Sequence, residues 1–386
     1  MSMSGGSASL SQQVQQALAR RDAAGALALI RGAEAGRPAD LDIKMQKAVA
    51  LRMSGDLKAA IAALDEALAL DPYHFVALLS KGALVEQAQS PRHAAAIYRN
   101  ALKILPADPP AAFQAPIARA RQVVAETTDA LEAFLSAKVA GLAVEADPAA
   151  KERFEESLRI FSGATRAYHS EAALLAYPRL PAIPFYDRAL FPWFAELEAA
   201  TDMIRGELET ALAEQEKDFA PYIAYPPGAP VNQWEELNHS RKWSSYFLWK
   251  DGARQDAACA HCPGTAALLD RIPMAHQPGF APTAMFSALT PHTRIPAHSG
   301  STNTRLLTHL PLILPGPARF RVGNVTRDWK MGEAWAFDDT IEHEAWNDAD
   351  SLRVILIIDI WNPYLTAAER DLVSAMMTAK NAFFSA

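Results

Sequence analysis

Apolar side chains recur at helical spacing along the first hundred residues of the chain. Ala60, Leu64 and Ala67 fall on one face of a helix, and Gly55 with the next residue supplies a turn before it. The arrangement returns every 34 residues, so each unit is predicted to be a helical hairpin. A proline follows each second helix, where it ends that helix and can start the next. Two series mark the period: Ala26, Ala60 and Ala94, and Pro38, Pro72 and Pro106.

This period, with small residues at fixed positions, resembles the tetratricopeptide repeat (TPR) over about residues 8–110, although the tryptophan usual near the start of that repeat does not appear. Stacked helical hairpins form concave surfaces. The resemblance therefore implies a domain that binds a peptide or a protein, and repeats that stack without a partner are the alternative. Residues 111–178 remain alanine-rich and helical in pattern, and we interpret them as a helical connector.

The pattern changes near residue 178. Closely spaced prolines (Pro178, Pro181 and Pro184) mark a boundary, and helical spacing returns only between Phe194 and Lys217. Short alternating runs broken by Gly, Pro and Asn follow, without helices between them. They favour a sandwich or closed jelly roll over residues 179–386. The predicted fold is thus multidomain α + β, a TPR-like helical solenoid followed by a jelly-roll domain of the double-stranded β-helix type. The predicted strands are 242–249, 282–289, 304–314, 318–323, 333–338 and 352–361.

The charge and hydropathy of the chain argue against binding to nucleic acid and against a membrane-spanning helix. The 386 residues include 37 Lys+Arg and 44 Asp+Glu, so a net charge of -7 does not favour binding to nucleic acid. The longest apolar stretches, such as Val354 to Ile358, end well short of the roughly 20 residues that a membrane helix needs. The opening residues lack the pattern of a secretory signal, so we expect a cytoplasmic protein without a transmembrane segment.

The two cysteines form one CxxC motif, Cys259 and Cys262. One such pair is half of a typical four-ligand zinc site. Two reduced thiols in a surface loop are therefore the first interpretation, and a redox pair or disulfide is the alternative.

Two histidines have neighbours that suggest chemistry. His298 is expected just after a strand and His343 just before the long strand of residues 352–361. A metal bound by imidazole needs ligands on rigid elements that face one cavity, which a jelly roll provides. A hydrogen-bonded structural role is the alternative for each. Carboxylates near the second histidine could orient it or replace a missing ligand through water, although at least two are expected to face solvent. These are Asp338, Asp339, Glu342 and Glu344.

Arg353 lies on the last predicted strand, where alternation places it on one face with Ile355 and Ile357. A guanidinium among isoleucines needs an anion, because an unpaired buried charge is costly. The anion is either a bound carboxylate or a side chain of the protein, Asp359 or Asp338.

Three ordered blocks carry a further resemblance: PAHSGSTNTRLLTHLPL, the run from RVGN to GEAWAFDDTIEHEAWND, and LRVILIIDIWNP. With LPAIPFYD and KWSSYFLW, they resemble the aspartyl/asparaginyl β-hydroxylase family of iron(II)- and 2-oxoglutarate-dependent oxygenases over about residues 180–363. The wider oxygenase class places a carboxylate two residues after the first histidine; this chain has Gly300 there, as does the hydroxylase family.

The resemblance implies a role for each matching residue. His298 and His343 match the iron ligands, and Arg353 and Ser287 match residues that hold 2-oxoglutarate. His309 matches a further histidine that contacts this cosubstrate, and Trp243 a tryptophan at the edge of its pocket. Known members have an arginine two residues before His309, where this chain has Leu307; Arg305 could compensate.

The resemblance implies Fe(II), 2-oxoglutarate and O2, with conversion of the cosubstrate to succinate and CO2 coupled to hydroxylation of an unactivated carbon. The leading hypothesis is a hydroxylase of the β-carbon of aspartyl or asparaginyl residues in a peptide or protein substrate held by the repeats. The alternatives are a hydroxylase of lipid acyl chains and a TPR scaffold with an inactive oxygenase-like domain.

Overall fold

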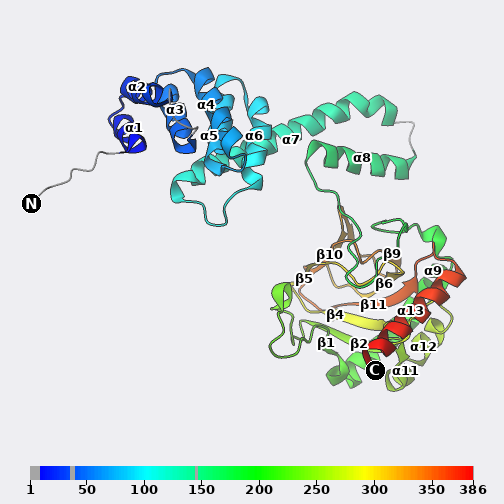
Figure 1. The fold of residues 1–386 in the computed structure, drawn as a ribbon. Helices are drawn as coiled ribbons and strands as arrows, with labels where there is room; N and C mark the ends of the chain where they lie inside the picture. The colour runs from blue at the N-terminus through cyan, green and yellow to red at the C-terminus, as the bar shows by residue number, and fades with distance from the viewer. Residues whose placement is uncertain (1–8, 35–39, 144–146, 386) are drawn as a thin grey trace, which may run out of the picture. The chain divides into compact units, whose positions relative to one another are not determined.

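The computed structural model describes residues 9–34, 40–143 and 147–385. The chain divides between Thr165 and Arg166 into two compact units, one helical and one built on β-sheets (Figure 1). The predicted order, a helical region followed by a β domain, is confirmed. In the described ranges no helix is long and apolar enough to cross a membrane.

The first unit is a series of antiparallel helical hairpins. Polar caps start several of these helices: the Ser90 side chain accepts from the backbone N–H of His93, and Pro91 occupies the first turn of α6. The repeated alanines Ala26, Ala60 and Ala94 are fully buried, so neighbouring helices approach closely. Pro38 lies outside the described residues. The helices are α1 (Leu10–Ala19), α2 (Ala23–Glu34), α3 (Leu41–Met53), α4 (Leu57–Leu70), α5 (Phe75–Ala88) and α6 (Pro91–Lys103).

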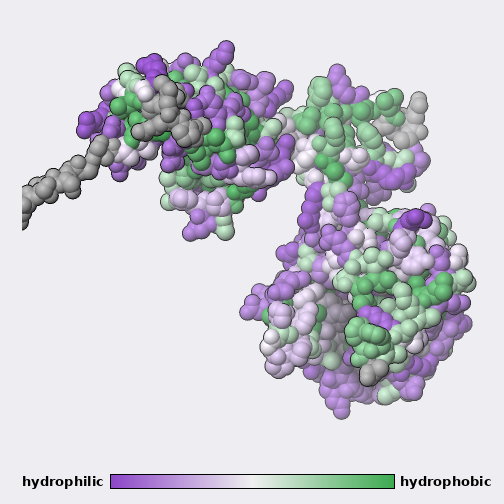
Figure 2. Space-filling model, viewed as in Figure 1, coloured by the Kyte–Doolittle hydropathy of each residue, from purple (hydrophilic) through white to green (hydrophobic). Residues whose placement is uncertain are grey.

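A 3-10 turn (Ala111–Phe113) leads into two further helices of the same unit, α7 (Gln114–Ala143) and α8 (Pro148–Ser162). The first half of α7 packs on the hairpins through Ile117, Ala120 and Val123. Its second half exposes apolar side chains, including Phe134 and Leu142, and hydrophobic colour gathers there in Figure 2.

The second unit contains two antiparallel sheets. The larger has the order β1-β2-β4-β11-β6-β9, with β3 beside β2, and the smaller has the order β5-β10-β7-β8. The strands are β1 (Ala220–Pro221), β2 (Trp243–Lys250), β3 (Ala253–Arg254), β4 (Ala284–Leu289), β5 (Thr293–His298), β6 (Arg305–Ile313), β7 (Ala318–Val322), β8 (Val325–Asp328), β9 (Trp335–Phe337), β10 (His343–Asn347) and β11 (Arg353–Trp361).

Alternation along β11 determines which core each side chain joins. Ile355 and Ile357 pack with Phe320 of the smaller sheet, so the two sheets face each other. Val354 and Leu356 point to the other face of the larger sheet, which helices cover. The predicted division of this strand into two faces is confirmed. The unit's helices are α9 (Phe194–Ala199), α10 (Thr201–Glu214), α11 (Asp256–His261), α12 (Pro263–Leu269) and α13 (Ala367–Ser385), with 3-10 turns at Arg188–Leu190, Glu216–Asp218 and Asn232–Trp234.

The expectation that no helix lies between the strands is wrong, because α11 and α12 lie between β3 and β4, and the strand β5 was not predicted. The structure differs from the sequence interpretation at three further places. His343 begins a separate strand, β10, because the short run HEAWN pairs with both β5 and β7. Residues 166–178, assigned to the connector, belong to the second unit, where Ser170 and Leu175 form β-bridges to Ile341 and Thr302.

The cysteines are the third difference. Both thiols are free; Cys259 lies in α11 and Cys262 lies between α11 and α12, so neither is in a surface loop. Cys259 and Cys262 are buried in the core on the helix-covered face of the larger sheet. Burial raises the pKa of Cys262 to about 12 and raises that of Cys259.

Candidate active site

A cavity of about 430 Å³ lies between the two sheets. Alternate residues of β6 and β11 line it, and their order creates a gradient of polarity. Arg353 and His309 lie at one end of the facing rows, and Arg305 and Asp359 lie at the other. The middle is apolar, lined by Met285, Leu307, Ile355 and Ile357.

His298 and His343 face each other across the pairing of β5 with β10, in which they are direct register partners. Their ring centroids are 4.1 Å apart. In each ring Nδ1 donates to a backbone carbonyl two residues earlier, Pro296 at 2.7 Å and Ile341 at 3.0 Å. These bonds fix the tautomer that leaves Nε2 unprotonated, as a metal ligand must be.

Burial, with the neighbouring His343, lowers the pKa of His298 to about 3, and burial lowers the pKa of His343 to about 4. Both imidazoles are therefore neutral near pH 7. Among the residues described, no group of three or more His, Cys, Asp or Glu side chains is arranged to hold a metal. The structure thus brings two imidazoles together without a third protein ligand.

At position 300, two residues after His298, the structure has no room for a side chain, because the carboxylate of Asp339 lies against Gly300. A Cβ atom at position 300 would lie 2.1 Å from Oδ2 of Asp339. The carboxylate of Asp339, which comes from the turn before β10, therefore occupies the space of a side chain at Gly300. Asp339 is buried and lines the cavity, and Arg305 pairs with it at 3.3 Å.

The remaining carboxylates of this turn do not act as expected. Asp338 accepts from Thr340, and Glu344 pairs with Arg321 and Arg294. Both are buried, as is Asp339, so the expectation that at least two of the four face solvent is wrong. The expectation that one of them orients His343 is also wrong, because a backbone carbonyl does so. Glu342 is half-buried and pairs with Arg321 and Arg166.

Arg353 is 1% exposed and makes no ion pair with any described residue. Asp359 pairs with Arg305 at 2.8 Å, and Asp338 bonds Thr340, so neither provides the internal anion considered from the sequence. Nη1 of Arg353 reaches only the carbonyl of Ser287, at 3.5 Å, and its Nε has no partner in the described structure. Burial lowers the pKa of Arg353 to about 9, so it remains a cation at pH 7.

Ser287, Trp243 and His309 lie around this arginine. Nε1 of Trp243 donates to Oγ of Ser287 at 3.0 Å, which leaves the serine proton available to the cavity. His309 is buried among Phe320, Phe337 and Trp329, and its Nδ1 has no partner in the described structure. Burial, with the charge of Arg353, holds the pKa of His309 well below its usual value. The six predicted site residues therefore line one cavity.

Sequence reasoning missed several aromatic residues of the cavity. The guanidinium of Arg353 lies 4.6 Å from the ring of Trp329, and the ring of Trp234 lies 4.9 Å from that of His298. Tyr222 stacks 4.2 Å from Trp243. Trp329 falls within a block that carried the resemblance, but Trp234 and Tyr222 lie in loop-rich sequence without a pattern that assigns them.

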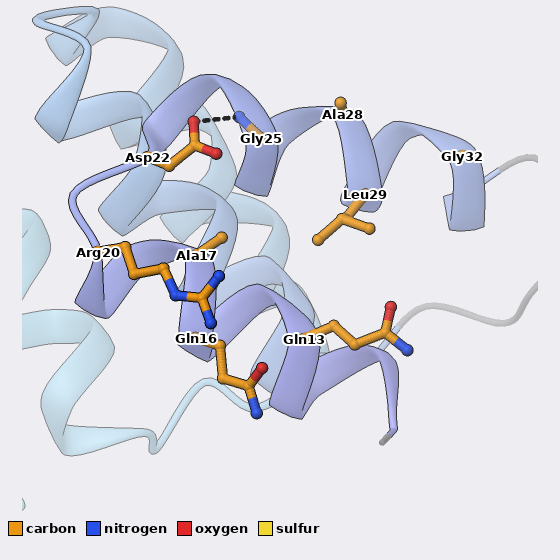
Figure 3. Close-up of a pocket in the computed structure, with 9 residues that line it drawn as sticks. All are labelled: Gln13, Gln16, Ala17, Arg20, Asp22, Gly25, Ala28, Leu29 and Gly32. Carbon is orange, nitrogen blue, oxygen red and sulfur yellow. Dashed lines mark hydrogen bonds between the residues drawn. The ribbon is translucent and has the colours of Figure 1, made fainter. Parts of the chain in front are cut away.

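A second cavity, of about 630 Å³, lies on the first helical hairpin (Figure 3). Gln13 and Gln16 line it from α1, Arg20 from the position directly after that helix, and Leu29 from α2. Asp22 accepts from the backbone N–H of Gly25 at 2.7 Å. The described residues that line this cavity include neither a buried charge nor a nucleophile.

Two facing antiparallel sheets thus hold paired imidazoles and a buried arginine in one cavity, and the comparisons with known proteins place this unit among the hydroxylases. A family model described as aspartyl/asparaginyl beta-hydroxylase matches residues 198–363. The chain belongs to this family.

Three relatives show how far the similarity extends. An ornithine lipid ester-linked acyl 2-hydroxylase of Rhizobium tropici is 35% identical over 233 residues, 59% of this chain and 75% of that protein. The aspartyl/asparaginyl beta-hydroxylase of Homo sapiens is 38% identical over 144 residues, 37% of this chain but 19% of its own length. An aspartate beta-hydroxylase domain-containing protein 2 of Xenopus tropicalis is 30% identical over 204 residues, 52% of each chain.

Proposed function

We propose that the protein is an Fe(II)- and 2-oxoglutarate-dependent dioxygenase that hydroxylates an unactivated carbon. The observation that carries the proposal is Arg353, a buried guanidinium without an internal anion in the same cavity as two neutral imidazoles. A cation so placed is stable only if a ligand supplies the anion.

The residues fit both groups. His298 and His343 would hold the iron through Nε2, since their Nδ1 atoms are committed to carbonyls. Arg353 and the Ser287 hydroxyl would hold the distal carboxylate of 2-oxoglutarate, and the unpartnered Nδ1 of His309 offers another polar contact. When bound, iron and 2-oxoglutarate supply the oxidising power, with O2 as the oxidant and succinate and CO2 as products.

The protein's own contribution is positioning and exclusion of water. Trp243 orients Ser287, and Trp329 covers the guanidinium of Arg353, so these contacts would position both groups for the cosubstrate. Asp339, fixed by Arg305, would orient water at the metal in place of the carboxylate that Gly300 cannot supply.

The wider architecture supports the same proposal. We assign the two facing sheets to the double-stranded β-helix fold and the 34-residue hairpins to the TPR type. The hairpins would recruit a peptide or protein partner through their concave surface.

Two substrate classes have support. The family name favours the β-carbon of an aspartyl or asparaginyl residue. The apolar middle of the cavity, with the acyl hydroxylase from Rhizobium tropici among the relatives, favours an acyl chain.

The proposal is tested by 2-oxoglutarate turnover without added substrate. Purified protein with Fe(II) in air should form succinate slowly, and His298→Ala and His343→Ala should each abolish it. The variant Asp202→Asn, on an exposed residue of α10, is the control and should retain turnover. Full turnover by His343→Ala would refute the assignment.

A further inference from the structure

The outer part of the cavity contains more carboxylates than cations. Arg305 is its cation, and it lies between two aspartates, with Nη1 2.8 Å from Asp359 and Nη2 3.3 Å from Asp339. The side chain of Arg305 is 12% exposed, and those of both aspartates are 4% exposed. The guanidinium of Arg305 is therefore ion-paired to two carboxylates inside the protein, and its Nε has no partner in the described structure.

Leu307 separates this outer end from the cosubstrate end. Arg305, Leu307 and His309 are alternate residues of β6 that line the cavity, and the side chain between the two polar ones is apolar. Among the described residues that line the cavity, the other cation is Arg353, which the proposed cosubstrate neutralises. No free cation is left to receive a carboxylate of the substrate.

The mouth of the cavity adds a negative charge. Asp251 lies in the turn between β2 and β3, is exposed, and makes no ion pair with any described residue. Aromatic rings line the cavity with it, from Tyr222, Tyr225 and Phe280. A carboxylate beside ring faces attracts an ammonium or guanidinium group.

We infer that the substrate carries its reacting carbon on an uncharged segment and presents a cationic group, not a carboxylate, to Asp251 and the aromatic mouth. This inference rests on the proposed function. It excludes an aspartyl side chain and fits either a basic peptide or an amine-bearing lipid, which share this chemistry.

The test uses protein loaded with Mn(II) and 2-oxoglutarate, which binds without turning over. Three probes share one hexanoyl chain: N-hexanoylputrescine (cationic), N-hexanoylbutylamine (neutral) and N-hexanoyl-4-aminobutyrate (anionic). Calorimetric titration should give the cationic probe an affinity about tenfold above that of the anionic one. Asp251→Asn should lose about fivefold of this preference, whereas Asp202→Asn should keep it, and Leu307→Arg should favour the anionic probe.

Competition against the cationic probe identifies the natural source. A lysine-containing peptide that competes indicates a protein substrate, and vesicles doped with N-oleoylputrescine, a lipid with an ammonium group and no carboxylate, that compete indicate a lipid. Equal or tighter binding of the anionic probe overturns the inference and leaves the proposed function standing. Failure of 2-oxoglutarate to bind with Mn(II), measured first in the same titration, overturns both.

Discussion

At the scale of single residues, the site depends on buried polar groups that have no partner within the described part of the protein. Arg353 is the clearest of them, because its guanidinium is buried against Trp329 and lacks a carboxylate among the described residues. Breaking or withholding one half of a buried ion pair is strongly destabilising. The unpaired charge of Arg353 therefore destabilises the ligand-free protein, and a bound dicarboxylate would remove this destabilisation.

Arg353→Met should separate stability from ligand binding. Without ligand, the variant should be as stable as the wild type or more stable by about 1–2 kcal/mol, since an uncompensated charge is removed. It should also lose the rise in melting temperature that 2-oxoglutarate with Mn(II) gives the wild type. Differential scanning fluorimetry measures both, and a variant that is still stabilised by 2-oxoglutarate would contradict this role for Arg353.

The contact between Gly300 and Asp339 gives a second residue-scale prediction. Gly300→Ala places Cβ against the Asp339 carboxylate and should destabilise the protein by about 2–3 kcal/mol, because the buried Asp339 must leave Arg305. Chemical denaturation measures the loss. The double variant with Asp339→Gly removes the clash and should recover more of that stability than the double variant with Asp338→Gly.

At the scale of elements, helices pack closely where small residues meet, and strands divide their side chains between two faces by alternation. In the helical unit, α5 meets α6 where Gly82 lies under Tyr98, and a Cβ at Gly82 would lie 2.5 Å from that ring. Gly82→Ala should destabilise the helical unit by about 1–3 kcal/mol and leave binding of Mn(II) unchanged. Circular dichroism and metal titration check this; Gly141→Ala, where a Cβ meets nothing within 4 Å, is the control.

The buried thiol of Cys262, between α11 and α12, predicts how stability and thiol reactivity depend on pH. The pKa of Cys262 is raised to about 12 by burial, from a usual value of 9.0, so native thiols should resist alkylation at pH 8.5 and react only after unfolding. Above about pH 9 the unfolded chain releases these protons and the folded chain retains them. The free energy of unfolding should therefore fall as the pH rises from 9 to 12. Rapid native alkylation would contradict this account.

The elements also show how far sequence could lead. Alternation in β11 predicted the two faces of that strand, and the 34-residue period predicted the hairpins. The strand β10 was missed because HEAWN is short and polar, and its stability comes from pairing on both sides. Its pairing with β5 places His343 opposite His298, which spacing along the chain does not encode.

Long-range partners limited the prediction of the site in the same way. Asp359, six residues from Arg353 on the same face of the same strand, was considered as its partner, but it pairs with Arg305 of the neighbouring β6. The close approach of the Asp339 carboxylate to Gly300 likewise joins residues from different loops. Residue types indicated the chemistry, and the pairing of strands determined which groups meet.

At the scale of the molecule, the chain consists of two compact units with separate cores. Ligands of the cavity should therefore stabilise one unit and not the other. With 2-oxoglutarate at about 100 times its dissociation constant, the sheet unit of the Mn(II)-loaded protein should gain about 2.7 kcal/mol over Mn(II) alone, or roughly 5–10 °C in melting temperature. Calorimetry should show one transition that moves and one that does not.

The most direct test of the central claim is an anaerobic titration of the full chain with Fe(II) and then 2-oxoglutarate, followed by the weak visible charge-transfer band of a chelated keto acid. The account predicts a band at one iron per chain that His343→Ala abolishes and that Arg353→Met shifts to about 100-fold higher 2-oxoglutarate. Iron that binds without producing the band, or a band that Arg353→Met leaves unmoved, would contradict it.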